Sequence, residues 1–131
     1  MTATAPTTTR DRLLRLAMRA DAVLTGLAGV AALPLAGRMA EWSGTTTTIE
    51  YSLAAFFIGY GLVVFGLSTL PSLRRAGLAV IAANLAYTVA AVVVVVTDVW
   101  SMTTVGVVLT LATGVYTAVF AELQYVGWRR L

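Results

Sequence analysis

Two carboxylates and one amide, those of Asp21, Glu122 and Asn84, lie inside long apolar stretches of the chain. Each is roughly two helical turns from the nearest polar boundary of its stretch, so we expect the three side chains to meet at one level. An acid near the centre of a membrane helix costs about 2.5–3.5 kcal/mol on insertion scales. Such an acid therefore needs a partner or contact with water, and it can carry a proton or bind a cation.

Arginines at the edges of the same stretches allow two interpretations of these acids. In the first, Arg19 pairs with Glu122 and Asp21 pairs with Arg129, so that two ion pairs clamp the first apolar stretch to the fourth. In the second, the acids form a proton-coupled or cation-coupled site that is open to the cytoplasm. The candidate polar cluster comprises Asp21, Asn84, Glu122, Arg19, Tyr87 and Arg129.

Cysteine and histidine are absent from the sequence, and this excludes several kinds of chemistry. Without them there is no disulfide, no thiol nucleophile, no imidazole base and no ordinary zinc, haem or iron–sulfur ligation. Carboxylates, Tyr and Arg are left to run any reaction at a membrane surface. We therefore expect no catalytic residues, no metal site and no cofactor.

The elements that position these residues must be membrane helices, because the composition is too apolar for a soluble domain of this size. Of 131 residues, 59% are apolar and 11% are charged, whereas soluble domains have roughly 45–50% and 25%. A small soluble domain has too much surface to hide that apolar fraction. The natural solvent of this chain is therefore lipid.

Four apolar segments follow one another, with short polar connections between them. The expected helices cover about 13–37, 51–70, 77–97 and 102–126. About 20 residues at 1.5 Å each cross a hydrocarbon core of roughly 30 Å. Short connections make consecutive helices antiparallel, so we predict an all-α, up-down-up-down bundle of four transmembrane helices. We expect residues 12–131 to form this single membrane domain and residues 1–11 to form a disordered tail.

The arginines indicate the orientation, because cytoplasmic loops retain positive charge. Of the nine, Arg38 alone falls on one side of the predicted bundle. The others are Arg10, Arg12, Arg15, Arg19, Arg74, Arg75, Arg129 and Arg130. We therefore expect a multi-pass protein of the bacterial inner (plasma) membrane with both termini in the cytoplasm. A cleaved signal peptide is the alternative for the first segment, although Asp21 interrupts its basic-to-apolar transition.

Small residues on the predicted helices favour close packing, as is typical of membrane bundles. The second helix offers Gly59, Gly61 and Gly66 for such contacts. A row at steps of four on the fourth helix comprises Gly106, Thr110, Gly114, Ala118 and Glu122. This row predicts that Glu122 faces the bundle centre. In the long outer connection 38–50, Thr47 and Glu50 fit a capping box for the second helix, with glycan or ligand binding as the alternative for this threonine run.

Three segments of the sequence carry a family resemblance: 15–26 (RLAMRADAVLTG), 82–84 (AAN) and 120–130 (FAELQYVGWRR). They look like a family of small four-helix integral membrane proteins of actinobacteria, and the likeness covers most of the chain. Members of that family more often have Leu before the Asp and Leu in place of Trp128. The resemblance implies fold and source, and it supplies no activity. A looser similarity to DoxX-like membrane proteins concerns architecture alone, which does not transfer function.

The expected function is that of a non-enzymatic scaffold or accessory subunit of a membrane complex, since the loops are short and the small-residue faces are abundant. The expected partners are the lipid bilayer and either a second copy of the chain or another membrane protein, with no nucleic acid. The alternative is a small dimeric transporter, or a lipid- or quinone-binding protein, that uses the cytoplasmic-side acidic cluster. A membrane-surface enzyme is a third hypothesis.

Overall fold

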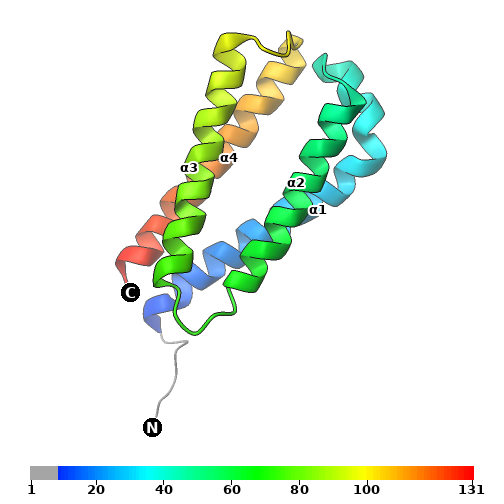
Figure 1. The fold of residues 1–131 in the computed structure, drawn as a ribbon. Coiled ribbons are helices and arrows are strands. Elements are labelled where there is room, and N and C mark those ends of the chain that lie inside the picture. The colour runs from blue at the N-terminus through cyan, green and yellow to red at the C-terminus, as the bar shows by residue number, and fades with distance from the viewer. Residues whose placement is uncertain (1–8) are drawn as a thin grey trace.

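The computed structural model describes residues 9–131, which form four α-helices joined by short connections (Figure 1). The helices are α1 (Thr9–Ser43), α2 (Thr47–Leu67), α3 (Arg74–Thr97) and α4 (Thr104–Arg129). Each helix is long and apolar enough to cross a membrane. The predicted all-α fold of four membrane helices is thereby confirmed.

The bundle has two ends that hold different parts of the chain (Figure 1). The beginning of α1, the α2–α3 connection at residues 68–73 and the end of α4 lie together at what we name the terminal end. The connections at residues 44–46 and 98–103 lie at the opposite end, which we name the hairpin end. Consecutive helices therefore run antiparallel.

The first helix is longer than expected at both ends. It has 35 residues, and only residues 44–46 connect it to α2, so the expected outer connection 38–50 is wrong. The helix continues past residue 37 because Ala40 and Ser43 are buried there. At its start α1 includes residues 9–11, which contradicts the expected tail at those positions, while residues 1–8 lie outside the described part of the chain.

The other three helices begin and end within four residues of their predicted bounds. At the start of α2, the Thr46 hydroxyl accepts a hydrogen bond from the backbone N–H of Ile49 at 3.2 Å and caps the helix. The predicted capping box of Thr47 with Glu50 is wrong, because the cap lies one residue earlier. Glu50 instead accepts a hydrogen bond from the Thr45 hydroxyl. The threonine run thus starts a helix, as its structural interpretation predicted.

The helices α1 and α2 pack so closely that no side chain fits between them where they cross. A Cβ built on Gly61 would lie 2.7 Å from the carbonyl oxygen of Ala22 and 2.9 Å from the Cα of Gly26. Such backbone approach is how helices associate in lipid. The other two glycines expected to serve this contact do not, because no atom of another described helix lies within 4 Å of a Cβ built on Gly59 or Gly66.

The first helix also meets α4, at both ends of the bundle. At the terminal end, a Cβ built on Gly127 would lie 2.7 Å from the backbone nitrogen of Leu14. At the hairpin end, the backbone N–H of Thr103 donates to the carbonyl of Ser43 at 3.0 Å, and Gly106 packs against that same residue. The α1–α2 and α3–α4 hairpins are therefore joined mainly along α1 and α4.

Apolar packing is concentrated at the terminal end, and a buried arginine ties the α2–α3 connection to it. The core cluster comprises Leu14, Met18, Ala22, Val64, Leu73, Ala76 and Val80. Arg15 donates to the carbonyls of Ser68 at 2.6 Å and Leu70 at 2.9 Å, and it pairs with Asp11 at 2.9 Å. Arg15 thus satisfies two carbonyls of the α2–α3 connection, which follows the last residue of α2.

Candidate functional site

The carboxylate of Asp21 is the centre of a hydrogen-bond network to which all four helices contribute. Its side chain is completely buried. One carboxylate oxygen, Oδ2, accepts hydrogen bonds from the Tyr60 hydroxyl at 2.8 Å, the Asn84 amide at 2.9 Å and the Gln124 amide at 3.0 Å. The Asn84 amide also donates to Oε1 of Gln124 at 2.9 Å. Residues from α2, α3 and α4 thus converge on one oxygen of α1.

The second carboxylate oxygen of Asp21, Oδ1, is held by hydroxyls. It accepts hydrogen bonds from Thr25 at 3.0 Å and from Tyr116 at 3.2 Å. The oxygens of these two hydroxyls are 2.9 Å apart, and because each hydroxyl has a single hydrogen, neither donates to the other while both donate to Oδ1. We name the complete network the Asp21 hub, and its residues are Asp21, Thr25, Tyr60, Asn84, Tyr116 and Gln124.

The number of donors indicates the charge of this carboxyl group. Five donors converge on Asp21. An ionised carboxylate only accepts hydrogen bonds and has about four lone-pair sites, whereas a protonated carboxyl must also place its own hydrogen. The arrangement therefore fits the ionised form. Among residues 9–131, no ion pair joins Asp21 to an arginine, so all of the groups that donate to the carboxylate are neutral.

The hub lies inside the membrane-spanning part of the helices, nearer to the terminal end than to the hairpin end. Asn84 is ten residues from the first residue of α3 and thirteen from the last, which places it about 15 Å and 20 Å from the two ends at 1.5 Å per residue. Ionisable side chains at such depth in membrane proteins are rare and usually serve a function. The hub is therefore the first candidate site in this bundle.

Of the predicted polar cluster, the structure brings Asp21 and Asn84 together but leaves Glu122 apart. The Glu122 side chain is exposed on the outer face of α4. Gln124, two residues further along the same helix, occupies the position at the bundle centre that was expected for Glu122. The predicted meeting of all three residues is therefore wrong, because α4 presents a different face to the bundle centre.

The two expected ion pairs do not form within residues 9–131. Arg19 instead donates to the Ser68 hydroxyl at 3.2 Å. Arg129 lies over the ring of Tyr125, with 5.7 Å between the guanidinium carbon and the ring centroid. Both arginines thus act at the terminal end. The first and fourth helices are joined by hydrogen bonds of the hub, by close backbone packing at Gly127 and by the Thr103–Ser43 hydrogen bond.

The helical repeat explains why Gln124 and not Glu122 faces inward. A row of residues at steps of four turns by about 40° per step in an ideal helix, so the row drifts away from the contact. Helices that coil around each other to the left keep contact along alternating steps of three and four. The buried residues of this part of α4 recur at steps of three, four, three and three, at Gly114, Thr117, Ala121, Gln124 and Gly127.

The two tyrosines of the hub are functional candidates that the sequence reasoning missed. Tyr60 and Tyr116 lie about two turns or more from the ends of their helices, whereas tyrosines of membrane proteins usually lie at the interfaces. A hydroxyl in the middle of a membrane span needs a partner there. Their position within the span was therefore the available signal.

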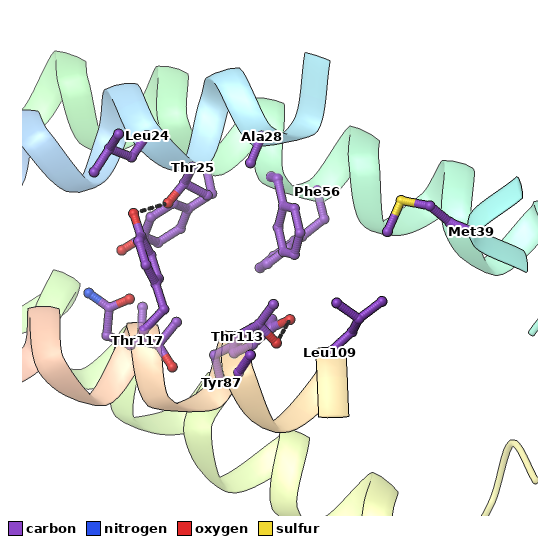
Figure 2. Close-up of a pocket in the computed structure, with 15 residues that line it drawn as sticks. Leu24, Thr25, Ala28, Met39, Phe56, Tyr87, Leu109, Thr113 and Thr117 are labelled. Carbon is purple, nitrogen blue, oxygen red and sulfur yellow. Dashed lines mark hydrogen bonds between the residues drawn. The ribbon is translucent and has the colours of Figure 1, made fainter. Parts of the chain in front are cut away.

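A cavity of about 330 Å³ adjoins the hub on the side of the hairpin end (Figure 2). All four helices line it, mostly with apolar and aromatic side chains. Figure 2 shows Ala28 and Phe56 on one side of the space, with Leu109 and Thr113 on the other. The side chain of Phe56 is 54% exposed, so the cavity reaches the surface of the bundle.

The polar side chains in the cavity wall already have partners within the bundle. The Tyr87 hydroxyl donates to Thr113 at 3.0 Å, and the Thr113 hydroxyl donates to the carbonyl of Thr110 at 2.7 Å. Thr117 donates to the carbonyl of Gly114 at 2.9 Å. The remaining polar wall residues belong to the hub. Tyr87, expected in the polar cluster beside Asn84, thus lies in the cavity wall.

A second cavity, of about 210 Å³, continues toward the hairpin end. The two cavities share five wall residues, Met39, Phe57, Tyr87, Leu109 and Thr113. The second cavity extends to Glu50 of α2 and Trp100 of the α3–α4 connection. The space between the hairpins therefore runs from the hub to the hairpin end.

Comparison with known proteins does not identify a family for this chain. No family model, no curated protein and no solved structure matches the chain. The site must therefore be interpreted from its own residues.

Proposed function

We propose that this small membrane protein binds a lipophilic molecule in the cavity between its two hairpins. The observation that carries the proposal is the cavity itself, with about 330 Å³ of space and a wall of apolar and aromatic side chains from all four helices. Ligand pockets in proteins typically have volumes of about 300–1,000 Å³ and largely apolar walls. The hub gives this pocket a fixed floor, and the opening beside Phe56 gives a molecule dissolved in the bilayer a way in.

The proposed setting is the bacterial inner membrane, with both termini in the cytoplasm. Support comes from the arginines, because those of the first part of α1, of the start of α3 and of the end of the chain lie at the terminal end, whereas Arg38 lies near the hairpin end. In this orientation the hub lies in the cytoplasmic half of the membrane, and the cavities extend through the outer half.

The test is binding of diphenylhexatriene, an uncharged apolar fluorophore, to the protein in lipid nanodiscs. We expect a saturable signal above that of empty nanodiscs, with one site per chain. Ala112 lines the cavity, so Ala112→Phe fills it and should abolish the saturable signal. The matched control is Ala86→Phe, at an exposed position of α3 outside both cavity walls. Equal binding by wild type and Ala112→Phe, or no saturable signal in wild type, would contradict the proposal.

The scaffold or accessory-subunit role expected from the sequence stays a prediction. It requires an outward face for a second chain, and Gly59 and Gly66 of α2 leave open space at such a face. The mass of the protein in nanodiscs, measured by light scattering, tests self-association. A mass equal to one chain would exclude the homo-oligomer.

A further inference from the structure

The charge of Asp21 is not balanced within the bundle. Neutral donors hold its carboxylate, and no ion pair reaches it within residues 9–131. The two arginines nearest to it in sequence are engaged at the terminal end, Arg15 with Asp11 and Arg19 with Ser68. A fixed negative charge in surroundings of low polarity acts over a longer distance than it does in water. The charge of Asp21 therefore contributes a negative potential to the cavity next to the hub, while the nearest cation in sequence, Arg19, is directed to Ser68.

The wall of the cavity also lacks free hydrogen-bond donors. The single proton of the Tyr60 hydroxyl goes to Asp21, and the two amide hydrogens of Asn84 go to Asp21 and Gln124. The Tyr87 hydroxyl uses its proton on Thr113. These groups present only oxygen lone pairs to the cavity, and lone pairs repel the oxygens of a carbonyl or phosphate group. A quinone or an anionic lipid headgroup would find no partner here.

Aromatic rings complete the wall and add to its preference for positive charge. The aromatic lining residues are Phe56, Phe57, Tyr60, Tyr87 and Tyr116. The face of an aromatic ring is negative, and it attracts cations by about 0.5–2 kcal/mol depending on how far water is excluded. Rings, lone pairs and the nearby carboxylate thus all favour the same sign of charge.

We propose that the ligand is a lipophilic cation, an apolar body with one delocalised or shielded positive charge, and that Asp21 is its counter-ion. This inference rests on the proposed function and names its ligand class. Asp21 does not itself line the cavity, because Thr25, Tyr60, Asn84 and Tyr116 lie between. It therefore attracts the cation without a direct bond, and the hub stays intact when the ligand binds. A quaternary ammonium or phosphonium centre, which has no hydrogen to donate, suits such a wall.

The experiment compares two probes of the same shape and size but opposite charge, tetraphenylphosphonium and tetraphenylborate. Their binding is measured by equilibrium dialysis against the protein in an uncharged detergent, with empty micelles as the blank. We expect tetraphenylphosphonium to bind at least about tenfold more tightly. The net charge of the chain is +3, so general attraction to the protein works against this result.

Two variants test whether Asp21 causes the preference for tetraphenylphosphonium over tetraphenylborate. Asp21→Asn keeps the shape of the side chain without its charge, and it should reduce the preference to about that of the micelles. Glu122→Gln removes an exposed acid of α4 and should leave the preference unchanged. If Asp21→Asn does not fold, Ala112→Phe still decides the question, because it leaves the hub untouched and should abolish the preference.

The outcomes separate this inference from the proposed function. Equal binding of both probes, tighter binding of tetraphenylborate, or a preference that survives in folded Asp21→Asn or in Ala112→Phe would overturn the inference. In each of these cases, loss of diphenylhexatriene binding in Ala112→Phe would still support a lipophilic site. Absence of saturable binding for all three probes would overturn both.

Discussion

The terminal half and the hairpin half of this bundle are built from the same four helices but hold them together differently. In the terminal half, Asp21 bonds to side chains of every other helix, and Gly127 lies against the backbone of α1. In the hairpin half, the two hairpins enclose a cavity of about 330 Å³. The difference teaches that one polar network can fix the helices while the space beside it stays open for a ligand.

The largest loss of stability is expected when the centre of the hub is removed. Asp21→Leu leaves five donors without their acceptor, and each unpaired buried group costs about 1–3 kcal/mol. We expect the free energy of unfolding to fall by more than about 3 kcal/mol, measured by titration with dodecyl sulfate and circular dichroism. Glu122→Leu is the control, and it should cost nothing. Similar losses in both variants would show that the hub is not what holds the terminal half together.

An intermediate loss is expected at the crossing of α1 and α2, which lies beside the hub. Gly61→Val places a side chain where a Cβ would already lie 2.7 Å from a backbone oxygen, so it should cost about 1–3 kcal/mol. Gly66→Val, on the same helix, meets open space and should change stability by less than about 0.5 kcal/mol. The same unfolding titration measures both. A smaller loss for Gly61→Val than for Gly66→Val would contradict tight packing in the terminal half.

The smallest effect compares one tyrosine of each half. Tyr60→Phe removes a donor to the buried carboxylate, and it should cost about 1–2 kcal/mol because the acceptor is charged. Tyr87→Phe removes a hydroxyl of the cavity wall whose partner, Thr113, keeps a bond to a backbone carbonyl. This change should cost less than about 0.5 kcal/mol. Thermal unfolding of the two variants in one detergent decides the point, and a reversed order would remove the distinction between the halves.

The sequence alone predicted the fold well, because apolar length and short connections leave few arrangements for a membrane protein. It placed Asp21 and Asn84 in contact for a similar reason, since both are polar side chains at matching depth. It failed at the ends of α1, and at the second end Ala40 and Ser43 continue a buried face past the predicted end. Helix ends outside the hydrocarbon depend on such contacts, and hydropathy does not describe them.

Whether Glu122 or Gln124 faces the bundle centre depends on how the helices pack against one another, and the sequence of α4 alone does not determine this. Which face of α4 turns inward is set by how the helices coil around one another, and a row at steps of four assumes straight packing. Charge also misled the prediction, since a carboxylate looks more functional than an amide. In the hub the amide is the better partner, because Asp21 needs donors and a second acid offers none.

The order in which the chain is made gives the hub a further consequence. Asp21 is synthesised 103 residues before Gln124 and 63 residues before Asn84. At about 5–20 residues per second, roughly 5–20 s pass between the first member of the hub and the last. During that time Thr25 is the one hub donor on the same helix as the acid. The acid in α1 therefore gains its full set of partners only after α4 has been synthesised. The last member of the hub to be made, Gln124, completes the network.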